Sequence, residues 1–288
     1  MDVTASIATV RARVDAARAA GKRIGFVPTM GALHAGHVSL IKAAVQQCQF
    51  VVVSIFVNPT QFGPGEDFER YPRDLEADRR ICEQAGVELV FAPGVKDMYP
   101  DRNLTLVTVE ELTTGLCGRF RPGHFRGVTT VCNKLFNIVR PDVAFFGQKD
   151  AQQAIVIKRM VADTNLPLEI VVCPTVREPD GLAMSSRNQY LSPDERKDAV
   201  LLYRALAAAE TMIERGERNC ARLVDAMSAI LNSSGRVSVE YVSIADVETL
   251  AELAVIRDKA LIAVAARVGK TRLIDNTIVN LNKHAGLV

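Results

Sequence analysis

Short apolar runs alternate with longer amphipathic segments along the first 174 residues of the chain. The run FVVVSIFV at 50–57 is built almost entirely of β-branched and aromatic residues, which is typical of a parallel strand covered on both faces. In VSLIKAAVQQC, at 38–48, apolar residues recur at helical spacing instead. The same criteria predict strands at 24–27, 87–91, 143–146 and 168–172, and helices at 6–20, 73–85, 125–139 and 150–163.

This alternation predicts the fold class of the first part of the chain. Strands and helices that follow one another at such spacing form right-handed βαβ units, and these assemble into a doubly wound parallel sheet of the Rossmann-like type. Sheets of this kind bind ligands at the carboxyl ends of their strands. We therefore expect an α/β protein whose functional residues follow directly after strands.

The pattern changes after residue 174. The sequence SPDE at 192–195 combines a side-chain cap, a proline at the first helical position and a glutamate at the third, and predicts a long helix that runs to about residue 216. A second helix is expected at 219–232, followed by two antiparallel strands at 237–244 and 260–268. The predicted organisation is a Rossmann-like domain at 1–174 and a smaller α+β domain at 175–288.

The composition excludes several classes of protein. With 48% hydrophobic and 24% charged residues among 288, the chain is an ordinary globular protein and not a disordered or fibrous one. Lysine and arginine number 35 against 33 acidic residues, a balance too even for a broad basic surface, so no nucleic-acid partner is expected. The N-terminus has no signal-peptide core, and no apolar run approaches the ~20 residues of a membrane span. We expect a cytoplasmic protein without a membrane partner.

The cysteine pattern supports the same compartment. Six cysteines are scattered along the chain without C-x-x-C spacing, which argues against a structural zinc site and against a disulfide framework. We expect them to be reduced and mostly buried, with Cys132 in the core face of a helix and none acting as a nucleophile. The six are Cys48, Cys82, Cys117, Cys132, Cys173 and Cys220.

Two of the four histidines, His34 and His37, stand three positions apart in MGALHAGH, where a predicted strand turns into a helix. Free N–H groups and the positive end of a helix favour an anion there, and two imidazoles add donors for phosphate oxygens. Two alternatives remain open at this point. The histidines are incidental members of a turn, or they form a metal pair, although a pair without a third nearby ligand is a poor zinc signature.

A second polar cluster, GQKDAQQ, begins at Gly147 at the end of another predicted strand. Gly147 permits close approach of the backbone, Lys149 offers a mobile positive charge for phosphate, and Asp150 can accept hydrogen bonds from ribose hydroxyls. The alternative is a solvated helix start, in which Asp150 only complements the helix dipole.

The third cluster is the loop DGLAMSSRN at 180–188, at the expected domain junction. Its serine hydroxyls and the fork of Arg187 suit a phosphate chain. Judged by composition alone, a flexible linker is the better interpretation of the same stretch.

Taken together, these motifs resemble those of a known family. HAGH is similar to the HIGH motif, and MSSR to a reduced KMSKS loop, of the nucleotidylyl-transferase superfamily. Four ordered segments, VPTMGALHAGH, SIFVNPTQFGPGEDFERYPRD, RPGHFRGVTTVCNKLFNIVRPDVAFFGQKDAQQ and DGLAMSSRNQYL, resemble the pantoate–β-alanine ligase (pantothenate synthetase) family. The likeness covers most of the chain, including the closing RLIDN. Many relatives have GEKD where this chain has GQKD.

The resemblance implies a two-step reaction that consumes ATP. Pantoate attacks the α-phosphate of ATP to give pantoyl adenylate and pyrophosphate, and β-alanine then displaces AMP to give pantothenate, an intermediate in coenzyme A biosynthesis. It further implies Mg²⁺ that bridges phosphate oxygens, with no protein ligand assigned, and a homodimer. The smaller domain is expected to act as a lid that closes over ATP and excludes water from the acyl adenylate.

The resemblance also assigns residues. The expected catalytic set consists of His37, as the proton donor, together with His34, Lys149, Ser185 and Arg187. The expected ATP site consists of Met30, Gly31, Ala32, Leu33, His34, Ala35, Gly36, His37, Gly147, Gln148, Lys149, Asp150, Val176, Met184, Ser185, Ser186 and Arg187. Gln61 and Gln153 are expected to bind pantoate, and Gln61 also β-alanine. Further candidates, for which a structural role is equally open, are Asn58, Tyr71, Arg121 and His124.

Other function classes remain to be distinguished. Another small-molecule nucleotidyltransferase would share the HAGH loop without needing Gln61 and Gln153. A nucleotide-sensing or RNA-binding module would bind without turnover, and the near-neutral charge weighs against it. A tRNA synthetase is disfavoured because no recognisable anticodon-binding segment follows the catalytic region.

Overall fold

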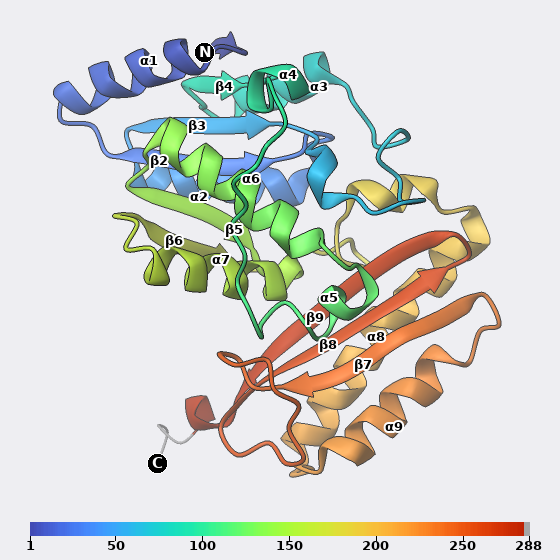
Figure 1. Cartoon of the computed structure of the whole chain (residues 1–288). Helices are drawn as coiled ribbons and strands as arrows, with labels where there is room; N and C mark the ends of the chain where they lie inside the picture. The colour runs from blue at the N-terminus through green and yellow to red at the C-terminus, as the bar shows by residue number, and fades with distance from the viewer. Residues whose placement is uncertain (285–288) are drawn as a thin grey trace.

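The computed structural model of the protein describes residues 1–284, which form two separate β-sheets with their helices (Figure 1). The first sheet has six parallel strands in the order β1-β4-β3-β2-β5-β6. The second has three antiparallel strands in the order β7-β8-β9. This confirms the predicted α/β fold with a smaller α+β part. Residues 285–288, the end of the predicted second domain, lie outside the described residues.

The strands of the first sheet follow the predicted ones closely, apart from the short N-terminal strand, which was not predicted. They are β1 (Asp2–Thr4), β2 (Ile24–Thr29), β3 (Phe50–Ile55), β4 (Leu89–Phe91), β5 (Val143–Gly147) and β6 (Glu169–Cys173). From β2 the chain winds outward to β3 and β4, and it then returns to place β5 on the other side of β2. This reversal opens a crevice at the carboxyl ends of β2 and β5, where open α/β sheets bind their ligands.

Helices cover both faces of this sheet. The strands carry apolar side chains at odd and even positions alike, and these side chains point to opposite faces. One face packs against α1 (Ile7–Ala19), α6 (His124–Val139) and α7 (Ala151–Asp163). The other packs against α2 (Ala35–Gln47) and α3 (Leu75–Gln84). On β3, for example, Val52 belongs to the first core and Val51 and Val53 to the second.

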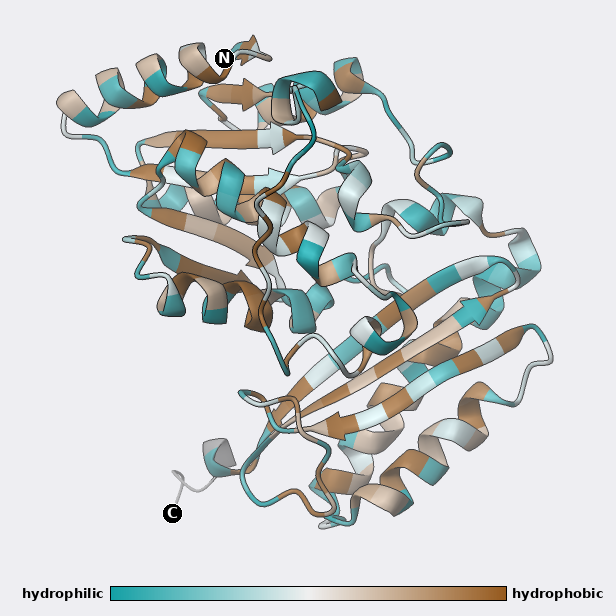
Figure 2. Cartoon of the chain, viewed as in Figure 1, coloured by the Kyte–Doolittle hydropathy of each residue, from teal (hydrophilic) through white to brown (hydrophobic). Residues whose placement is uncertain are grey.

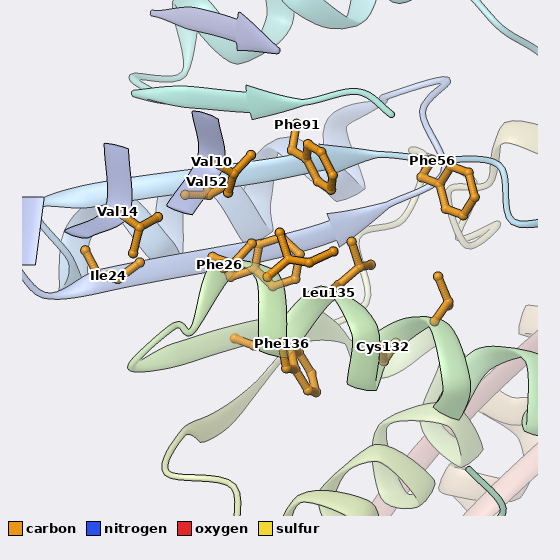
Figure 3. Packing of buried hydrophobic residues seen from close by; sticks show 14 of the residues in the cluster. Val10, Val14, Ile24, Phe26, Val52, Phe56, Phe91, Cys132, Leu135 and Phe136 are labelled. Carbon is orange, nitrogen blue, oxygen red and sulfur yellow. The ribbon is translucent and has the colours of Figure 1, made fainter. Parts of the chain in front are cut away.

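Aromatic side chains fill the core beneath α6. Figure 3 shows Phe26 of β2 facing Leu135 and Phe136 of α6. The rings of Phe26 and Phe136 meet edge to face with centroids 6.3 Å apart, and Phe146 of β5 meets Phe136 in the same way at 6.4 Å. This packing holds α6 and the strands as one rigid platform for the loops at their ends.

The second sheet carries its own core. Its strands are β7 (Val237–Ala245), β8 (Lys259–Val268) and β9 (Thr271–Asn280), and it packs on α8 (Pro193–Glu214) and α9 (Cys220–Leu231). Figure 2 shows apolar residues along most of the central strand β8. The antiparallel pairing of the two predicted strands is confirmed. The third strand, β9, was not predicted. Its sequence TRLIDNTIVN carries polar residues at buried positions, so apolar and polar residues do not alternate as they do in a typical strand.

The helix ends differ from the predicted ones by a few residues. The largest difference is at α2, which begins at Ala35 with His34 as its N-cap, so that the histidine motif is part of the first turn. The start of α8 is as predicted: Ser192 and Glu195 exchange side-chain and backbone hydrogen bonds. Six further short elements were not predicted: α4 (Val95–Met98), α5 (Cys117–Phe120), η1 (Pro59–Gln61), η2 (Gln148–Asp150), η3 (Ser186–Tyr190) and η4 (Leu281–His284).

All six cysteines are buried and unpaired, as expected, and Cys132 lies in the core beneath α6. Burial raises the pKa of the Cys132 thiol to about 12, which keeps it protonated and unreactive. Within residues 1–284, none of the helices combines the length and the apolar character that a membrane crossing requires.

The close approach of α6 to η1 gives a test of this packing. A Cβ on Gly127 would lie 2.3 Å from the carbonyl oxygen of Thr60. Alanine normally favours a helix over glycine by ~1 kcal/mol, but here the clash should win and lower the free energy of unfolding by about 1–3 kcal/mol. Urea denaturation of Gly127→Ala measures this. Gly115→Ala, whose Cβ meets nothing within 4 Å, is the control and should change little; equal stabilities for the two variants would contradict the packing.

Candidate active site

Three segments from different parts of the chain meet at the carboxyl ends of the parallel strands. We call them the histidine loop (residues 30–37, after β2), the lysine turn (147–150, after β5) and the junction segment (174–192, after β6). They line a cavity of about 220 Å³. A larger cavity of about 660 Å³ lies beside it and reaches the second sheet. Lys149, Gln153 and Arg187 line both, so the two cavities form one continuous cleft.

The histidines close the first turn of α2. Nδ1 of His34 accepts a hydrogen bond from the backbone N–H of Gly36 at 3.1 Å, and Nδ1 of His37 accepts one from the backbone N–H of His34 at 3.3 Å. The centroids of the two rings lie 4.2 Å apart. A side chain on Gly36 would collide with the His34 ring at 2.9 Å, which explains the small residue between them. The histidines therefore cap the helix and face the cleft at the same time.

These hydrogen bonds fix the protonation of both rings. Because each Nδ1 accepts a hydrogen bond, each neutral ring carries its proton on Nε2. Burial, together with the nearby Lys149, lowers the pKa of His34 to about 4. Burial and the neighbouring His34 lower the pKa of His37 to about 3. At neutral pH the pair offers two N–H donors and no positive charge.

The histidine loop is held from behind by a carboxylate. Asp78 of α3 is 2% exposed and accepts hydrogen bonds from the backbone N–H groups of Ala32 at 3.0 Å and Leu33 at 2.7 Å. Gly31 and Ala32 both have positive φ, and a side chain on Gly31 would come within 2.8 Å of the Asp78 carboxylate. Burial raises the pKa of Asp78 despite these two hydrogen bonds. The loop is thus fixed in shape before any ligand arrives.

The lysine turn places one charge of each sign at the cleft. The ammonium of Lys149 lies 3.9 Å from the Asp150 carboxylate, and both residues line both cavities. Burial opposes the charge on Asp150, but Lys149 and Arg187 outweigh it and keep the pKa of Asp150 below its usual range. A lysine held beside the end of a parallel strand suits a polyphosphate.

The junction segment is an ordered part of the site. Arg177 forms a bidentate ion pair with the buried Asp275 of β9, with N–O distances of 2.6 and 3.1 Å, and donates to the carbonyl oxygen of Gly181 at 3.0 Å. The backbone N–H of Met184 donates to the carbonyl of Val176 at 3.0 Å. These contacts argue against the flexible-linker interpretation.

Arg187 already has a carboxylate partner. Its guanidinium contacts both oxygens of Asp67 at 2.8 and 2.9 Å and lies over the ring of Tyr71. Burial alone would raise the pKa of Asp67, but the guanidinium brings it below its usual range. Tyr71 in turn contacts the hydroxyl of Ser186 at 3.2 Å. The loop that contains residues 66–71 therefore orients the end of the junction segment that carries Ser186 and Arg187.

Gln61 sits in an amide network at the floor of the cleft. Its carbonyl oxygen accepts from Asn58 at 3.1 Å, and its amide contacts the Met30 sulfur at 2.9 Å. Asn58 is 1% exposed and receives a further hydrogen bond from Tyr99 at 3.0 Å. A thioether is a weak acceptor, so the Gln61 amide can exchange it for a stronger one on a ligand.

Arg121 and His124 form the neighbouring wall. Nδ1 of His124 donates to the carbonyl of Gln61 at 2.8 Å, so its Nε2 accepts from Arg121 at 3.1 Å. Burial and the Arg121 charge lower the pKa of His124 to about 4. Arg121 is also paired with Glu66 at 2.5 Å. These two candidates thus support the backbone beside Gln61 and also line both cavities.

The structure brings most of the expected residues to the cleft. The residues that line the smaller cavity are Met30, His34, Gly36, His37, Asn58, Gln61, Tyr71, Arg121, His124, Gly147, Lys149, Asp150, Gln153, Val176, Met184, Ser185, Ser186 and Arg187. The expected residues outside its lining are Gly31, Ala32, Leu33, Ala35 and Gln148. Ala35 is exposed, and Gln148 lines a separate groove behind the turn.

Several supporting residues were missed by sequence reasoning. Asp67, Asp78 and Asn276 each fix one of the three segments, yet none of them was among the predicted site residues. Asn276 is the last residue of the closing RLIDN, which carries part of the resemblance. Asp67 lies in a quoted segment, SIFVNPTQFGPGEDFERYPRD, but only its pairing with Arg187 reveals its role. Partners so distant in sequence carry no spacing signal.

The chain is similar to known proteins in both sequence and structure. A family model described as Pantoate-beta-alanine ligase matches residues 2–278. The pantothenate synthetase of Thermoanaerobacter pseudethanolicus is 56% identical over 96% of this chain and 98% of that protein. That of Moorella thermoacetica is 56% identical over 98% of this chain and 100% of that protein.

Solved structures agree with these matches. The crystal structure of pantothenate synthetase from Thermus thermophilus has a TM-score of 0.92 and 48% identity, and the match covers 96% of this chain and 99% of that one. The pantoate-beta-alanine ligase from Francisella tularensis, solved in complex with beta-gamma ATP and beta-alanine, has a TM-score of 0.78 and 36% identity, with 96% and 97% covered.

The support of the histidine loop by Asp78 is open to a stability test. In Asp78→Asn the amide can accept only one of the two backbone hydrogen bonds, so the free energy of unfolding should fall by about 1–3 kcal/mol in urea denaturation. Asp74→Asn on the same helix is the control. Asp74 caps α3 through Ala77, and asparagine caps helices equally well, so that variant should stay within ~0.5 kcal/mol. Equal losses in both variants would contradict the support.

The lowered histidine pKa values predict how stability depends on pH. Histidines of the unfolded chain take up protons near pH 6.5, whereas His34, His37 and His124 do so only at about 4, 3 and 4. Below 6.5 the unfolded state binds more protons, so the free energy of unfolding should fall as the pH drops from 6.5 to 5. Each ring contributes at most about 1.4 kcal/mol per pH unit. Denaturation of His124→Gln should give a smaller slope; an unchanged slope would contradict the assignment.

Proposed function

The chain belongs to the pantoate-beta-alanine ligase family and is an ATP-dependent ligase that joins pantoate to β-alanine in an amide bond; we propose that the cleft between its two sheets carries out both steps of that reaction. The observation that carries the proposal is the meeting of the histidine loop, the lysine turn and the junction segment at one cleft. Of the alternatives, another small-molecule nucleotidyltransferase is not favoured, because the relatives match over almost the whole chain.

The nucleotide enters at the crevice between β2 and β5. The proposed ATP site is the set expected from the sequence: residues 30–37, 147–150 and 184–187, with Val176. The start of α2 supports this site, because it offers backbone N–H groups and two neutral imidazoles. The backbone contacts of both rings involve Nδ1, so each Nε2–H group can donate to a ligand. The five members of this set outside the cavity lining act through the shape of the backbone. The relative from Francisella tularensis was solved in complex with beta-gamma ATP and beta-alanine.

Activation requires positive charge where negative charge accumulates. A carboxylate oxygen of pantoate forms a bond to the α-phosphorus while the bond from that phosphorus to the pyrophosphate oxygen breaks. Lys149, Arg187 and the hydroxyl of Ser185 are proposed to stabilise the phosphate oxygens during this displacement. His34 and His37 act as neutral donors. Because its pKa is about 3, His37 can act as a proton donor only if the bound polyphosphate raises that pKa.

Pantoate is proposed to bind between Gln61 and Gln153. Neutral amides hold a hydroxy acid without a tight salt bridge, which would stabilise the ground state as much as the transition state. Gln61 is positioned by Asn58, and its amide can leave the Met30 sulfur for a ligand oxygen. In the second step the amine of β-alanine, held beside Gln61, attacks the acyl carbon, and AMP leaves with the electron pair of the broken acyl–phosphate bond.

Mg²⁺ is proposed to enter with the nucleotide. Within residues 1–284, no group of three or more His, Cys, Asp or Glu side chains could hold a metal ion. Mg²⁺ commonly keeps several waters and binds through one or two carboxylates and the substrate's phosphates. Asp150, which faces both cavities, fits as the single protein carboxylate. The ion would neutralise phosphate charge during the displacement.

The wider assignments rest on the same family relationship. We assign residues 1–174 to nucleotide and pantoate binding and residues 175–288 to a lid that closes over the acyl adenylate. The larger cavity, which lies between the lysine turn and β9, is the space that such a closure would reduce. We also propose a homodimer and a cytoplasmic location, where ATP is available and thiols stay reduced.

The reaction itself can be tested by omission. AMP formation is measured with ATP, Mg²⁺, pantoate and β-alanine, and each is left out in turn. The proposal predicts that AMP release needs all four. AMP release that is unaffected by omission of β-alanine would indicate a different acceptor and overturn it.

Two single variants test the proposed catalytic set. His37→Ala and Lys149→Ala should each lower turnover by at least ~10²-fold, the usual loss when one transition-state donor is removed. Lys158→Ala, an exposed lysine on α7, is the matched control and should retain normal turnover. Near-normal turnover in either test variant would remove that residue from the mechanism.

Gln153→Ala tests the pantoate site by steady-state kinetics. Removal of a substrate contact should raise the KM for pantoate by ~10-fold or more while the KM for ATP changes little. Gln46→Ala, on the exposed face of α2, is the control. If the KM for pantoate is unchanged, Gln153 does not contact pantoate.

A further inference from the structure

One strand of the second sheet reaches two of the three segments of the active site. Asn276 of β9 is 4% exposed, and its amide Nδ2 donates hydrogen bonds to the carbonyl oxygens of Gln148 and Lys149, both at 2.9 Å. Its neighbour Asp275 is 2% exposed and holds Arg177 at the base of the junction segment. Two adjacent residues of β9 thus form hydrogen bonds with the lysine turn and with the junction segment, which carries Arg187.

The lysine turn has little internal support. Residues 148–150 form a single turn of 3-10 helix, and its cap, Gly147, has no side chain with which to cap it. The following helix, α7, likewise starts without a side-chain cap bond from Asp150. The direction of the Lys149 side chain follows from the orientation of its peptide groups. Those peptide groups are held from outside the turn, by Asn276.

The amide orientation of Asn276 is set by its surroundings. In the opposite orientation its oxygen would face the two carbonyl oxygens that now accept hydrogen bonds. In the observed orientation Oδ1 is buried without a partner. A buried unpaired acceptor lowers stability, so the oxygen of this side chain gives no reason for an asparagine here. The presence of an asparagine is therefore better explained by the carbonyl groups of Gln148 and Lys149, to which its amide donates.

We propose that Asn276 is a positioning residue for the ligase reaction: through its two hydrogen bonds it aims Lys149 into the cleft. The inference rests on the proposed role of Lys149 in stabilising phosphate charge. It makes the second sheet part of the activation machinery, because the lysine turn can take its active shape only when β9 is seated against it.

A double-mutant cycle separates this role from a merely structural one. Asn276→Asp keeps the size of the side chain but replaces Nδ2, which carries both donors, with an oxygen. That oxygen repels the carbonyl oxygens of Gln148 and Lys149. Pantoate-dependent release of pyrophosphate from ATP is measured for the wild type, Asn276→Asp, Lys149→Ala and the double variant. Asn280→Asp, at the end of the same strand, is the control. Within the part of the chain that the structure describes, the one hydrogen bond of the Asn280 side chain is accepted by Oδ1 from the backbone N–H of Asn282, which aspartate can also accept.

The expected pattern is non-additive. In the presence of Lys149, Asn276→Asp should lower kcat by ~10-fold or more, whereas in the Lys149→Ala background the same change should cost less than ~2-fold. Asn280→Asp should behave as wild type. The melting temperature is recorded for each variant, and if Asn276→Asp does not fold, Asn276→Ala is taken through the same cycle.

Two results would overturn the inference. An equal loss in both backgrounds means that Asn276 acts on the fold and not through Lys149, and a normal rate in Asn276→Asp means that the two hydrogen bonds are not needed. Both leave the ligase assignment intact. If Lys149→Ala itself releases pyrophosphate at the normal rate, the role of Lys149 falls, and this inference with it.

Discussion

Hydrogen bonds that close the first turn of α2 determine what the active site can do. His34 and His37 accept backbone N–H groups through Nδ1, so the helix start is capped and each ring keeps its Nε2–H. Burial keeps both rings neutral, so in the proposed reaction they would donate to phosphate oxygens without placing an unpaired positive charge in the buried site. The small residue between them, Gly36, is required because the His34 ring occupies the space of its side chain.

The lysine turn and the junction segment add charged side chains beside these donors. The parallel sheet places the histidine loop and the lysine turn side by side where its strand order reverses, and the junction segment closes the third side. The cations are not free: Arg187 is paired with Asp67, and Lys149 lies near Asp150. In the proposed reaction a bound polyphosphate would meet charges that are already oriented, so little reorganisation would be needed during the displacement.

The sequence predicted the parts of this arrangement that repeat or lie close together. Segments such as 50–57 are nearly unbroken apolar runs, and HAGH, GQKD and MSSR stand at strand ends or in the junction loop, so the sheet and the motifs could be found. The strand β9 was missed because Asp275 and Asn276 are buried polar residues whose partners lie far away in the sequence. Asp78 was missed for the same reason, since it looks like one more charge on an exposed helix until the loop is folded against it.

The protonation of the two histidines tests this account most directly. With only four histidines in the chain, ¹⁵N labelling of histidine resolves each ring by NMR. The account predicts that His34 and His37 are neutral, carry the proton on Nε2 and do not titrate between about pH 8 and 5.5 in the free enzyme. Rings protonated on Nδ1, or midpoints near the ordinary value of 6.5, would contradict it.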